Sequence, residues 1–534
     1  MNRRYFIQAV SAFLALSALS SSCKGRKKLS GKIMGASAHV GHLLRDKKFD
    51  KPVSIIQKDV VIIGGGISGL SAAYHLKKTG VHDFLLLDLE EKTGGNSAHG
   101  NNATSAYPWG AHYVPIPNND LTEYISFLKE ANVITGQNEQ GLPLYNDMFL
   151  CFHPEERLYI NGQWQEGLVP HFGVPPEERK QIEKFLALMN DFRYKKGSDG
   201  KEAFALPVNA SSNDDAFVQL DSVTMKAWLE QQGFNSPYLH WYVNYCTRDD
   251  FGTPYDKASA WAGIHYFACR KGKGANAEHQ DVLTWPEGNG WLAQQLQNSI
   301  QANIQTSNLA TKIEQSEDKI IVSYFDVKSN LVKAIEAKQC IVAVPQFVAS
   351  RLLNDPVRIK EVQQHLQYVP WMVANLSVSQ LEERSGAPPS WDNVIYGSDS
   401  LGYVEATHQL LNQYMPRRNL TYYLPLTEGN VLEARKAAQA TTYGQWTEKV
   451  FRDLKRIHPN IEEATEELNV QIWGHSMAQP VPGMIHGRIR QKLSASISNR
   501  IHFAHTDLAG VSLFEEGFYQ GLNAANIVKQ NLPA

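Results

Sequence analysis

Short apolar runs and helical patterns alternate in three distant stretches of this chain. The runs are rich in β-branched and other aliphatic residues, which predicts buried strands. They lie at residues 59–63, 84–87, 309–314, 320–325, 339–345 and 501–504. Apolar positions recur at helical spacing at 70–78 and at 513–531. Strands that alternate with helices in this way predict an α/β fold.

A glycine-rich turn joins the first of these strands to its helix. The turn reads Gly-Gly-Gly-Ile-Ser-Gly from Gly64 onward. Gly64 permits a tight turn, Gly66 allows a pyrophosphate to approach the backbone, and Gly69 lets the helix pack close to the strand. The free N–H groups of the helix start, where Ser68 lies, then face the phosphates. Asp88 ends the next strand at the position of a ribose-hydroxyl acceptor, so these elements together predict a dinucleotide-binding unit.

The strands of this unit are far apart in sequence, which predicts a domain built from several segments. We expect a Rossmann-like domain from residues 53–120, 270–350 and 465–534. The intervening residues 121–269 and 351–464 are expected to form an α+β substrate domain. Helical patterns at residues 177–192 and 434–457 occupy part of that domain.

The first 23 residues have the order of a secretory signal peptide. Arg3 and Arg4 precede a short apolar stretch, and small serines lead to Cys23. The paired arginines resemble a twin-arginine signal, a route for folded proteins, and Ser-Ser-Ser-Cys resembles a lipoprotein cleavage box. We therefore expect an exported protein, either periplasmic or held on a membrane by lipid at Cys23. A cleaved signal with an incidental cysteine is the alternative.

Residues 24–52 are rich in lysine and arginine and are expected to form a basic tether. Such a tether attracts anionic lipid or simply stays solvated between anchor and domain.

The composition limits the kinds of partner that the protein is expected to bind. The chain has 52 Lys and Arg against 54 Asp and Glu, so nothing points to nucleic acid. The five cysteines form no C-x-x-C pair, so no metal or redox motif is indicated. We expect a small-molecule substrate as the partner.

Two further segments resemble one family. Residues 87–97 read Leu-Asp-Leu-Glu-Glu-Lys-Thr-Gly-Gly-Asn-Ser, and residues 108–113 read Pro-Trp-Gly-Ala-His-Tyr. Both are similar to flavin amine oxidases, and so is the closing strand, turn and helix at 501–531. The resemblance implies an FAD-dependent oxidoreductase. It also implies non-covalent FAD, because residues 501–534 lack the cysteine that related covalent enzymes carry there.

The resemblance also implies which residues contact FAD. Besides the glycine turn and Asp88, these are Gly94, Gly95 and Asn96 at the diphosphate, Gly110, Ala111 and His112 beside the flavin ring, the backbone of Ala310 at the adenine, and Asp507 at the ribityl chain. Asn96 stands where the family usually has an arginine, so a neutral group replaces a charge.

The last helix has its own start signal. Ser512 and Glu515 have the spacing of a capping box at its N-terminus. The positive end of this helix would stabilise negative charge on reduced flavin.

Amine oxidation on a flavin requires an oriented C–H bond and an unprotonated nitrogen more than it requires acid–base groups. Family members carry a tryptophan near the substrate just before the last flavin-binding strand, and Trp473 matches it. His475 is a candidate base, with a structural histidine as the alternative. The segment Arg248-Asp249-Asp250 could bind a polar substrate, but a charged surface turn is favoured because charged residues are mostly exposed.

Aromatic residues are dense in the segments expected near a substrate, and most are expected in the core. They are Trp241, Tyr242, Tyr245, Trp261, Tyr266, Trp285 and Trp473.

Alternatives to amine oxidation stay open at this point. Isoprenoid desaturases and porphyrinogen oxidases have similar flavin segments, and the missing arginine at Asn96 leaves room for a flavin-binding protein without turnover. A long apolar tunnel would favour the desaturases and porphyrinogen oxidases, whereas a short aromatic cage would favour amines. The electron acceptor, oxygen or another, is not fixed by the sequence.

Overall fold

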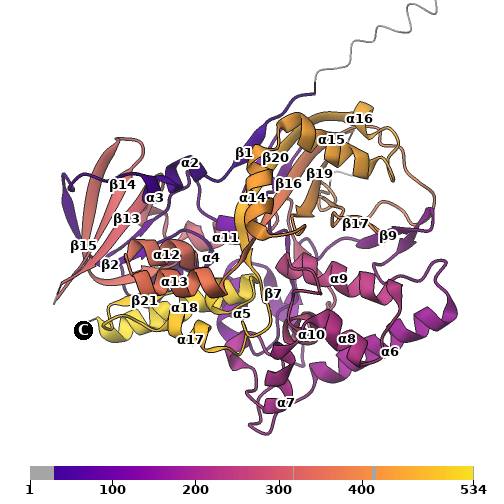
Figure 1. Cartoon of the computed structure of the whole chain (residues 1–534), viewed down its shortest axis with the longest axis horizontal. Coiled ribbons are helices and arrows are strands. Elements are labelled where there is room, and N and C mark those ends of the chain that lie inside the picture. The colour runs from indigo at the N-terminus through magenta and orange to yellow at the C-terminus, as the bar shows by residue number, and fades with distance from the viewer. Residues whose placement is uncertain (1–28, 317, 412–415, 533–534) are drawn as a thin grey trace, which may run out of the picture.

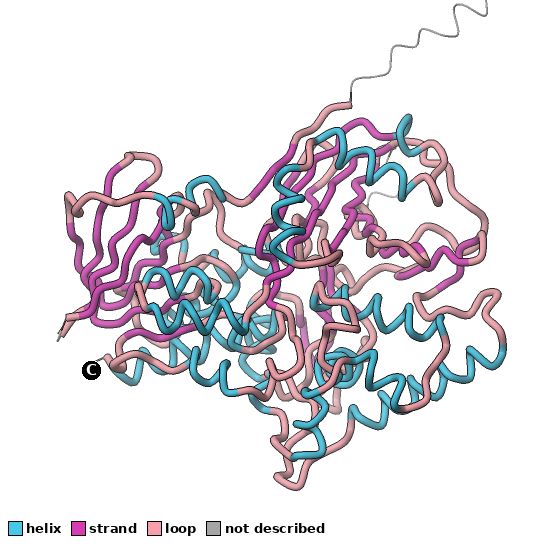
Figure 2. Tube along the Cα trace, viewed as in Figure 1, coloured by secondary structure: helices cyan, strands magenta, loops and turns pink. Residues whose placement is uncertain are grey.

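The computed structural model describes residues 29–316, 318–411 and 416–532. Two large β-sheets, one of seven strands and one of eight, organise these residues. Figure 1 shows the two sheets in separate halves of the molecule, and Figure 2 shows the helices arranged around them. The expected signal peptide, including Arg3, Arg4 and Cys23, lies outside the described residues.

The seven-stranded sheet contains the strands predicted around the glycine turn. Its order is β12-β3-β2-β15-β14-β13, with β21 paired to β15. The strands β2, β3, β12, β15 and β21 are parallel, whereas β13, β14 and β15 form an antiparallel meander. Their bounds are β2 (Ile55–Ile63), β3 (Phe84–Leu87), β12 (Ile304–Gln305), β13 (Asn308–Gln315), β14 (Ile320–Asp326), β15 (Leu331–Val342) and β21 (Ile501–Phe503). The α/β class predicted from the sequence is confirmed.

Two helices from opposite ends of the chain pack together beside this sheet. They are α4 (Ile67–Lys78), which follows the glycine turn, and α18 (Phe514–Asn531). At Gly521 of α18 a Cβ atom would lie 2.1 Å from the carbonyl oxygen of Ser68, so only glycine allows this approach. The other helices near this sheet are α11 (Gly290–Asn298), α12 (Gln346–Leu352), α13 (Pro356–His365) and α17 (Arg488–Ser494).

The eight-stranded sheet has the order β1-β20-β16-β19-β18-β17-β9-β10. Its strands are β1 (Ile33–Gly35), β9 (Glu156–Ile160), β10 (Gln163–Glu166), β16 (Tyr368–Val378), β17 (Asp392–Ile395), β18 (Tyr403–Glu405), β19 (Arg418–Pro425) and β20 (Thr465–Ala478). The helices α14 (Val431–Ala440), α15 (Tyr443–Leu454) and α16 (Ile461–Ala464) lie beside it in Figure 1. Trp446, Val450 and Leu454 of α15 are buried in the cluster that also holds strand residues Leu420 and Leu468.

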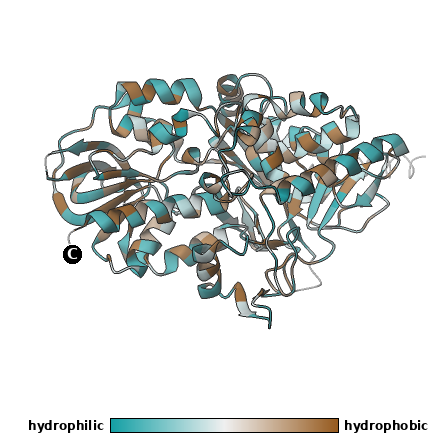
Figure 3. Ribbon diagram, turned by 90° about the horizontal axis from the view of Figure 1, so that it is seen from below, coloured by the Kyte–Doolittle hydropathy of each residue, from teal (hydrophilic) through white to brown (hydrophobic). Residues whose placement is uncertain are grey.

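The remaining helices and short strands connect the two sheets. The helices are α2 (Ala38–Gly41), α3 (Leu43–Asp46), α5 (Thr122–Glu130), α6 (Pro176–Arg193), α7 (Asp215–Val218), α8 (Met225–Gln231), α9 (Pro237–Phe251) and α10 (Ala260–Ala268). The paired short strands are β4 (His99–Asn101) with β5 (Ala106–Pro108), β6 (Tyr113–Pro115) with β11 (Val282–Thr284), and β7 (Ile134–Gln137) with β8 (Pro143–Tyr145). In Figure 3 many helices carry both hydrophobic and hydrophilic segments, as expected of helices with one face on a core.

Two segment boundaries differ from expectation. Strand β20 was expected in the nucleotide-binding domain as the start of residues 465–534, but it pairs with β1 and β16 in the eight-stranded sheet. Its alternation of Leu468, Val470 and Ile472 with polar residues is typical of an antiparallel sheet. Strand β1 comes from the expected basic tether, so the described part of the tether is folded against the domain.

Two helix predictions are corrected. The single helix expected at 434–457 is two helices, because Thr442 forms a capping box with Gln445 and starts α15. The capping box expected at Ser512 is wrong: α18 begins at Phe514 without a side-chain cap, and the Glu515 carboxylate pairs with Arg270 instead. Among the described helices, none is both long and apolar enough to cross a bilayer.

Candidate functional site

The glycine turn opens into a cleft of about 250 Å³, which we call the cofactor cleft. It lies where β2, β15 and β21 end and α4 and α18 begin. The residues predicted from sequence that line it are Gly64, Gly66, Ser68, Asp88, Gly94, Gly95, Asn96, Ala111, His475 and Asp507. The structure therefore brings together residues that are more than 400 positions apart in the chain.

Three glycines of the turn have different roles. Gly64 has a φ of +103°, and a Cβ atom at Gly69 would lie 1.8 Å from the carbonyl oxygen of Gly64. These two glycines build the turn and its contact with the helix. Gly66 lines the cleft, and a Cβ atom there would meet nothing within 4 Å. The space beside Gly66 is therefore open to a ligand, as a bound pyrophosphate requires.

The Asp88 carboxylate is held at the edge of the cleft by backbone donors. It accepts hydrogen bonds from the N–H of Gly65 at 2.5 Å and the N–H of Glu90 at 2.7 Å. Burial raises the pKa of Asp88 to about 6 in spite of these two bonds. Because Asp88 lines the cleft, its carboxylate can accept a hydrogen bond from a ribose hydroxyl.

The Asp507 carboxylate is buried at the opposite side of the glycine turn. It accepts hydrogen bonds from the Tyr368 hydroxyl at 2.5 Å and from the N–H of Gln346 at 2.8 Å. Burial alone would raise the pKa of Asp507, but His505 and these hydrogen bonds hold that pKa below its ordinary value. Asp507 is thus a fixed anionic acceptor in the cleft.

Asn96 fastens the cleft to a neighbouring segment. Its side-chain amide donates to the carbonyl of Ser476 at 2.6 Å, and its backbone carbonyl accepts from the N–H of Ala111 at 2.9 Å. A Cβ atom at Gly110 would lie 2.3 Å from that same carbonyl. Asn96 therefore joins the Gly94–Gly95 turn to the 108–113 segment and to the end of β20.

His475 lies in the wall of the cofactor cleft. Its ring stacks on Phe347 with centroids 4.3 Å apart, and burial lowers the pKa of His475 to about 3. His475 is not among the described residues that line the second, neighbouring cavity. The structure thus places this candidate base with the cofactor residues and keeps its ring neutral.

Ala310 lies outside the cleft lining. It is the third residue of β13, is paired with Tyr324 across the β13–β14 hairpin, and is buried. Its expected contact with adenine stays a prediction.

A second cavity of about 140 Å³ adjoins the cofactor cleft; we call it the inner cavity. Residues shared by both linings are Asn96, Ala111, Asn289, Ser476, Ser512, Leu513 and Phe514. Aromatic side chains of the inner cavity are His112, Tyr113, Trp371, Tyr423, Trp473 and Phe514, and its charged residues are Asp249, Asp250, Arg270 and Glu515. A ligand in this cavity would lie directly beside a ligand in the cleft.

The predicted residues Trp473, Gly110 and His112 lie in this inner cavity. The Trp473 Nε1 donates to the carbonyl of Trp109 at 2.6 Å, which fixes the ring. His112 stacks on Tyr423 with centroids 4.6 Å apart, and burial lowers the pKa of His112 to about 4. The other six aromatic residues singled out in the sequence are absent from its described lining.

The prediction of a charged surface turn at Arg248-Asp249-Asp250 is wrong. These residues form the last turn of α9, and both carboxylates line the inner cavity. The Tyr113 hydroxyl donates to Asp249 at 3.4 Å. Burial, reinforced by the neighbouring Asp250, raises the pKa of Asp249 to about 7. Burial raises the pKa of Asp250 to about 6, against the opposing effect of Arg270.

The one cationic residue in the described lining of the inner cavity, Arg270, is already paired. Arg270 Nη1 lies 2.8 Å from the Glu515 carboxylate, and both side chains are largely buried. In the part of the chain that the structure describes, Asp249 and Asp250 form no ion pair within 4.0 Å. The lining thus carries two carboxylates without an ion-pair partner, which is a site for a cationic group.

A family model and several known proteins match this chain. The family model of flavin containing amine oxidoreductases matches residues 67–529. The flavin-containing amine oxidase A of Canis lupus familiaris is 23% identical over 322 residues, which are 58% of this chain and 54% of the relative. Dimethylglycine dehydrogenase of Rattus norvegicus is 34% identical over 83 residues, 16% of this chain. The match covers about a tenth of that relative's length.

Among solved structures, a putrescine oxidase with putrescine bound has a TM-score of 0.64 at 17% identity. The match covers 89% of this chain and 100% of that one. At this identity the likeness concerns the fold.

Proposed function

The chain belongs to the flavin containing amine oxidoreductase family and is an FAD-dependent oxidoreductase, and on this premise we propose that it oxidises an amine at the carbon next to nitrogen. The observation that carries the proposal is the pair of unpaired carboxylates, Asp249 and Asp250, in a cavity that adjoins the cofactor cleft. Amines are cationic at neutral pH, with ordinary pKa values near ~10. A cation in the inner cavity would offset the desolvation of both carboxylates.

The cofactor cleft presents hydrogen-bond donors and acceptors that suit FAD. Gly66 leaves room for the diphosphate, Asp88 is placed for the adenosine ribose, and Asp507 for the ribityl chain. When bound, FAD supplies an acceptor for the hydride of the substrate C–H bond.

We propose that FAD is held without a covalent bond, since no cysteine is present among the described lining residues. Acid precipitation should then release the colour, and a coloured pellet would refute this.

The residues of the inner cavity orient the substrate and exclude water. Asp249 and Asp250 attract the ammonium group, and Asp249, whose pKa is raised to about 7, would take its proton so that the nitrogen is neutral when the C–H bond is oxidised. The rings of Trp371, Tyr423 and Trp473 enclose the carbon chain. The same carboxylates disfavour the apolar polyene of a desaturase. They also repel the carboxylates of a porphyrinogen, so amine oxidation is favoured over both alternatives.

The experiment that tests the proposal compares two proteins without oxygen. Amines should bleach the flavin of the wild type, and the double substitution Asp249→Asn with Asp250→Asn should raise the amine concentration needed by about a hundredfold. Equal flavin reduction in both proteins would contradict the assignment of these carboxylates.

The pH dependence follows from the raised pKa values of Asp249, about 7, and Asp250, about 6. Below pH 6 both carboxyl groups are mostly protonated and neutral, and above pH 7 both are mostly ionised. An amine stays cationic throughout this window. The KM for an amine should therefore fall, by about tenfold, as pH rises from 5.5 to 8. Stopped-flow measurement of wild type and the Asp249→Asn variant checks this, and a flat wild-type profile would contradict it.

Trp473→Ala should slow flavin reduction by roughly ten- to a hundredfold while FAD stays bound. The Trp473 ring lines the inner cavity and is absent from the described lining of the cofactor cleft, so its loss loosens the substrate and spares the cofactor. Single-turnover rates and the absorbance ratio of flavin to protein measure the two effects. Loss of FAD from this variant would show that Trp473 binds the cofactor and not the substrate.

We also propose that the protein is exported and held on a membrane by lipid at Cys23. Support comes from the sequence of residues 1–23 alone, with Arg3 and Arg4 before a short apolar stretch. Cys23→Ser should release the protein into the soluble fraction. A wild-type protein that begins elsewhere than Cys23 would refute the lipid anchor.

A further inference from the structure

A third cavity, of about 640 Å³, lies apart from the cofactor cleft and the inner cavity; we call it the α9–α15 cavity. Its lining comes from the second half of α9, the end of β19 and the helices α14 and α15, which are labelled in Figure 1. It shares no described lining residue with the other two cavities. Its volume is in the range of about 300–1,000 Å³ that small-ligand sites usually have.

Arg248 is the one charged residue in the described lining of this cavity that is buried, with 8% of its surface exposed. Its Nη2 atom donates to the backbone carbonyl of Asp399, and its Nε atom is buried without a hydrogen-bond partner. Its Nη1 atom makes no hydrogen bond with the described residues and keeps accessible surface. Because Arg248 lines this cavity, the free donors of its guanidinium are available to a ligand there.

The charge of Arg248 is also uncompensated. In the described part of the chain, Arg248 has no ion-pair partner within 4.0 Å. Burial lowers the pKa of Arg248 in spite of the nearby charge of Asp399. A buried cation without a countercharge costs free energy, which a bound anionic group would offset.

A second buried donor in the lining lacks an acceptor. The Trp446 side chain of α15 is 4% exposed, and its Nε1 atom has no hydrogen-bond partner among the described residues. Buried polar atoms are almost always satisfied in folded proteins. Arg248 and Trp446 therefore indicate an occupant that carries hydrogen-bond acceptors.

The rest of the lining restricts the charge of this occupant. Lys449 and Arg452 of α15 add two cations, and neither forms an ion pair within 4.0 Å with a described residue. Exposed acidic residues lie in the same lining and repel a ligand with several negative charges; they are Asp399, Glu428, Glu433 and Glu448. Apolar surface is provided by Pro254, Leu424, Leu426, Ala434 and Ala438. A single carboxylate on an apolar body fits this lining better than phosphate or a polyanion.

The α9–α15 cavity and the inner cavity have two elements in common. Arg248 is followed in the last turn of α9 by Asp249 and Asp250, which line the inner cavity. On β19, Leu424 lines the α9–α15 cavity, whereas its neighbour Tyr423 lines the inner cavity. A charge bound at Arg248 therefore acts on the two carboxylates of the inner cavity.

We propose that the α9–α15 cavity is an effector site, which binds the carboxylate of a small organic acid through Arg248. The negative charge of the acid offsets that of Arg248 and so increases the attraction of Asp249 and Asp250 for a cationic amine. The carboxylate site goes beyond the proposed amine oxidation, whereas its effect on the amine rests on that function.

The test follows thermal unfolding of the FAD-loaded protein with straight-chain carboxylates from butanoate to octanoate, each compared with its primary amide at equal ionic strength. The carboxylates should raise the unfolding midpoint in a saturable way, and the amides should not. Arg248→Gln should weaken carboxylate binding by about tenfold or more, because the buried countercharge is lost. A wild-type protein that no carboxylate stabilises would refute the site.

Two further variants keep the test decisive where Arg248→Gln does not fold. Lys449→Gln removes a half-buried cation of the same lining and should weaken carboxylate binding by roughly threefold. The control Lys436→Gln removes an exposed cation of α14 that lines none of the described cavities, and it should bind carboxylates as wild type does. Equal carboxylate binding by wild type and every folded variant would overturn the assignment to this cavity.

Flavin reduction by an amine without oxygen gives a second readout. A saturating carboxylate should lower the amine concentration for half-maximal reduction by about threefold in wild type, and not in Arg248→Gln. A raised concentration would show competition within the inner cavity and overturn the separate site, and an unchanged one would overturn the effector role. If no amine reduces the flavin while the unfolding shifts hold, the proposed function fails and the carboxylate site stands.

Discussion

Replacing Gly66 with valine is expected to give a folded protein that holds less than about a tenth of the wild-type FAD. A Cβ atom at Gly66 would meet nothing within 4 Å, so the start of an added side chain has room in the turn itself. The added side chain would instead occupy the space of the cofactor diphosphate. Flavin content from absorbance and folding from circular dichroism check both parts of this expectation.

The matched control is Gly69→Val in the same turn. A Cβ atom at Gly69 would lie 1.8 Å from the Gly64 carbonyl oxygen, so this variant should lose its fold together with its flavin. A Gly66→Val protein with a full complement of FAD would show that the cofactor lies elsewhere. A Gly66→Val protein that unfolds as Gly69→Val does would show that Gly66 is part of the turn structure.

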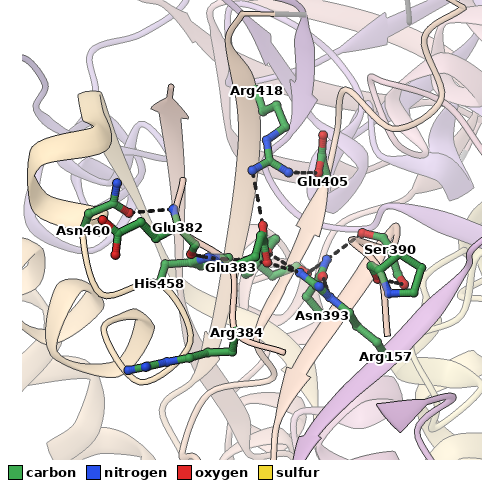
Figure 4. A network of polar contacts seen from close by, with 12 residues as sticks. Arg157, Glu382, Glu383, Arg384, Ser390, Asn393, Glu405, Arg418, His458 and Asn460 are labelled. Carbon is green, nitrogen blue, oxygen red and sulfur yellow. Dashed lines mark hydrogen bonds and ion pairs between the residues drawn. The ribbon is translucent and has the colours of Figure 1, made fainter. Parts of the chain in front are cut away.

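Replacing Arg157 with methionine is expected to destabilise the protein by about 3–5 kcal/mol. The Arg157 side chain is fully buried, stacks on Trp164 at 3.9 Å, and pairs with Glu383. Removing Arg157 leaves the negative charge of Glu383 less compensated, and it leaves the Asn393 side-chain oxygen without its hydrogen-bond donor. Figure 4 shows that the same network reaches Arg418 and Glu405.

Thermal and denaturant unfolding of the FAD-loaded protein measure this effect. The control is Arg45→Met, because the Arg45–Asp46 pair is exposed and its loss should leave the unfolding midpoint almost unchanged. If both variants unfold at the wild-type midpoint, the buried network does not hold β9 to β17.

The cofactor cleft could be predicted from sequence because its signals are local. The strand, the glycine turn, the helix and Asp88 follow one another within 40 residues, and each has a steric or hydrogen-bonding reason. Asp507 came from the resemblance of the closing segment, and the structure places it in the same cleft. The α/β class followed from the same strands.

The acidic side of the inner cavity could not be predicted, because its residues depend on contacts between distant elements. Asp249 and Asp250 look like a surface turn, since three consecutive charged residues are usually solvated. Only the packing of α9 against Tyr113 places them inside. The helix pattern of residues 237–251, with Val243 and Cys246 buried one turn apart, was the one signal that could have suggested this.

The starts of α15 and α18 also show where a local sequence signal is sufficient and where it is not. Thr442 and Gln445 match a capping box and form one, whereas Ser512 and Glu515 match it and do not. The outcome depends on which partner lies nearby in the folded protein: Arg270 lies beside Glu515 and forms an ion pair with its carboxylate. A local motif therefore predicts a cap only where no buried charge competes for its acid.

The central claim is tested most directly by mixing the FAD-loaded protein with amines in the absence of oxygen and following the flavin absorbance. The panel contains monoamines, diamines and polyamines, with an apolar polyene and a porphyrinogen as the competing substrates. Bleaching by amines alone, faster at pH 8 than at pH 5.5, is the predicted result. Flavin that stays oxidised with every amine, or that is bleached by the polyene or the porphyrinogen instead, would contradict the account.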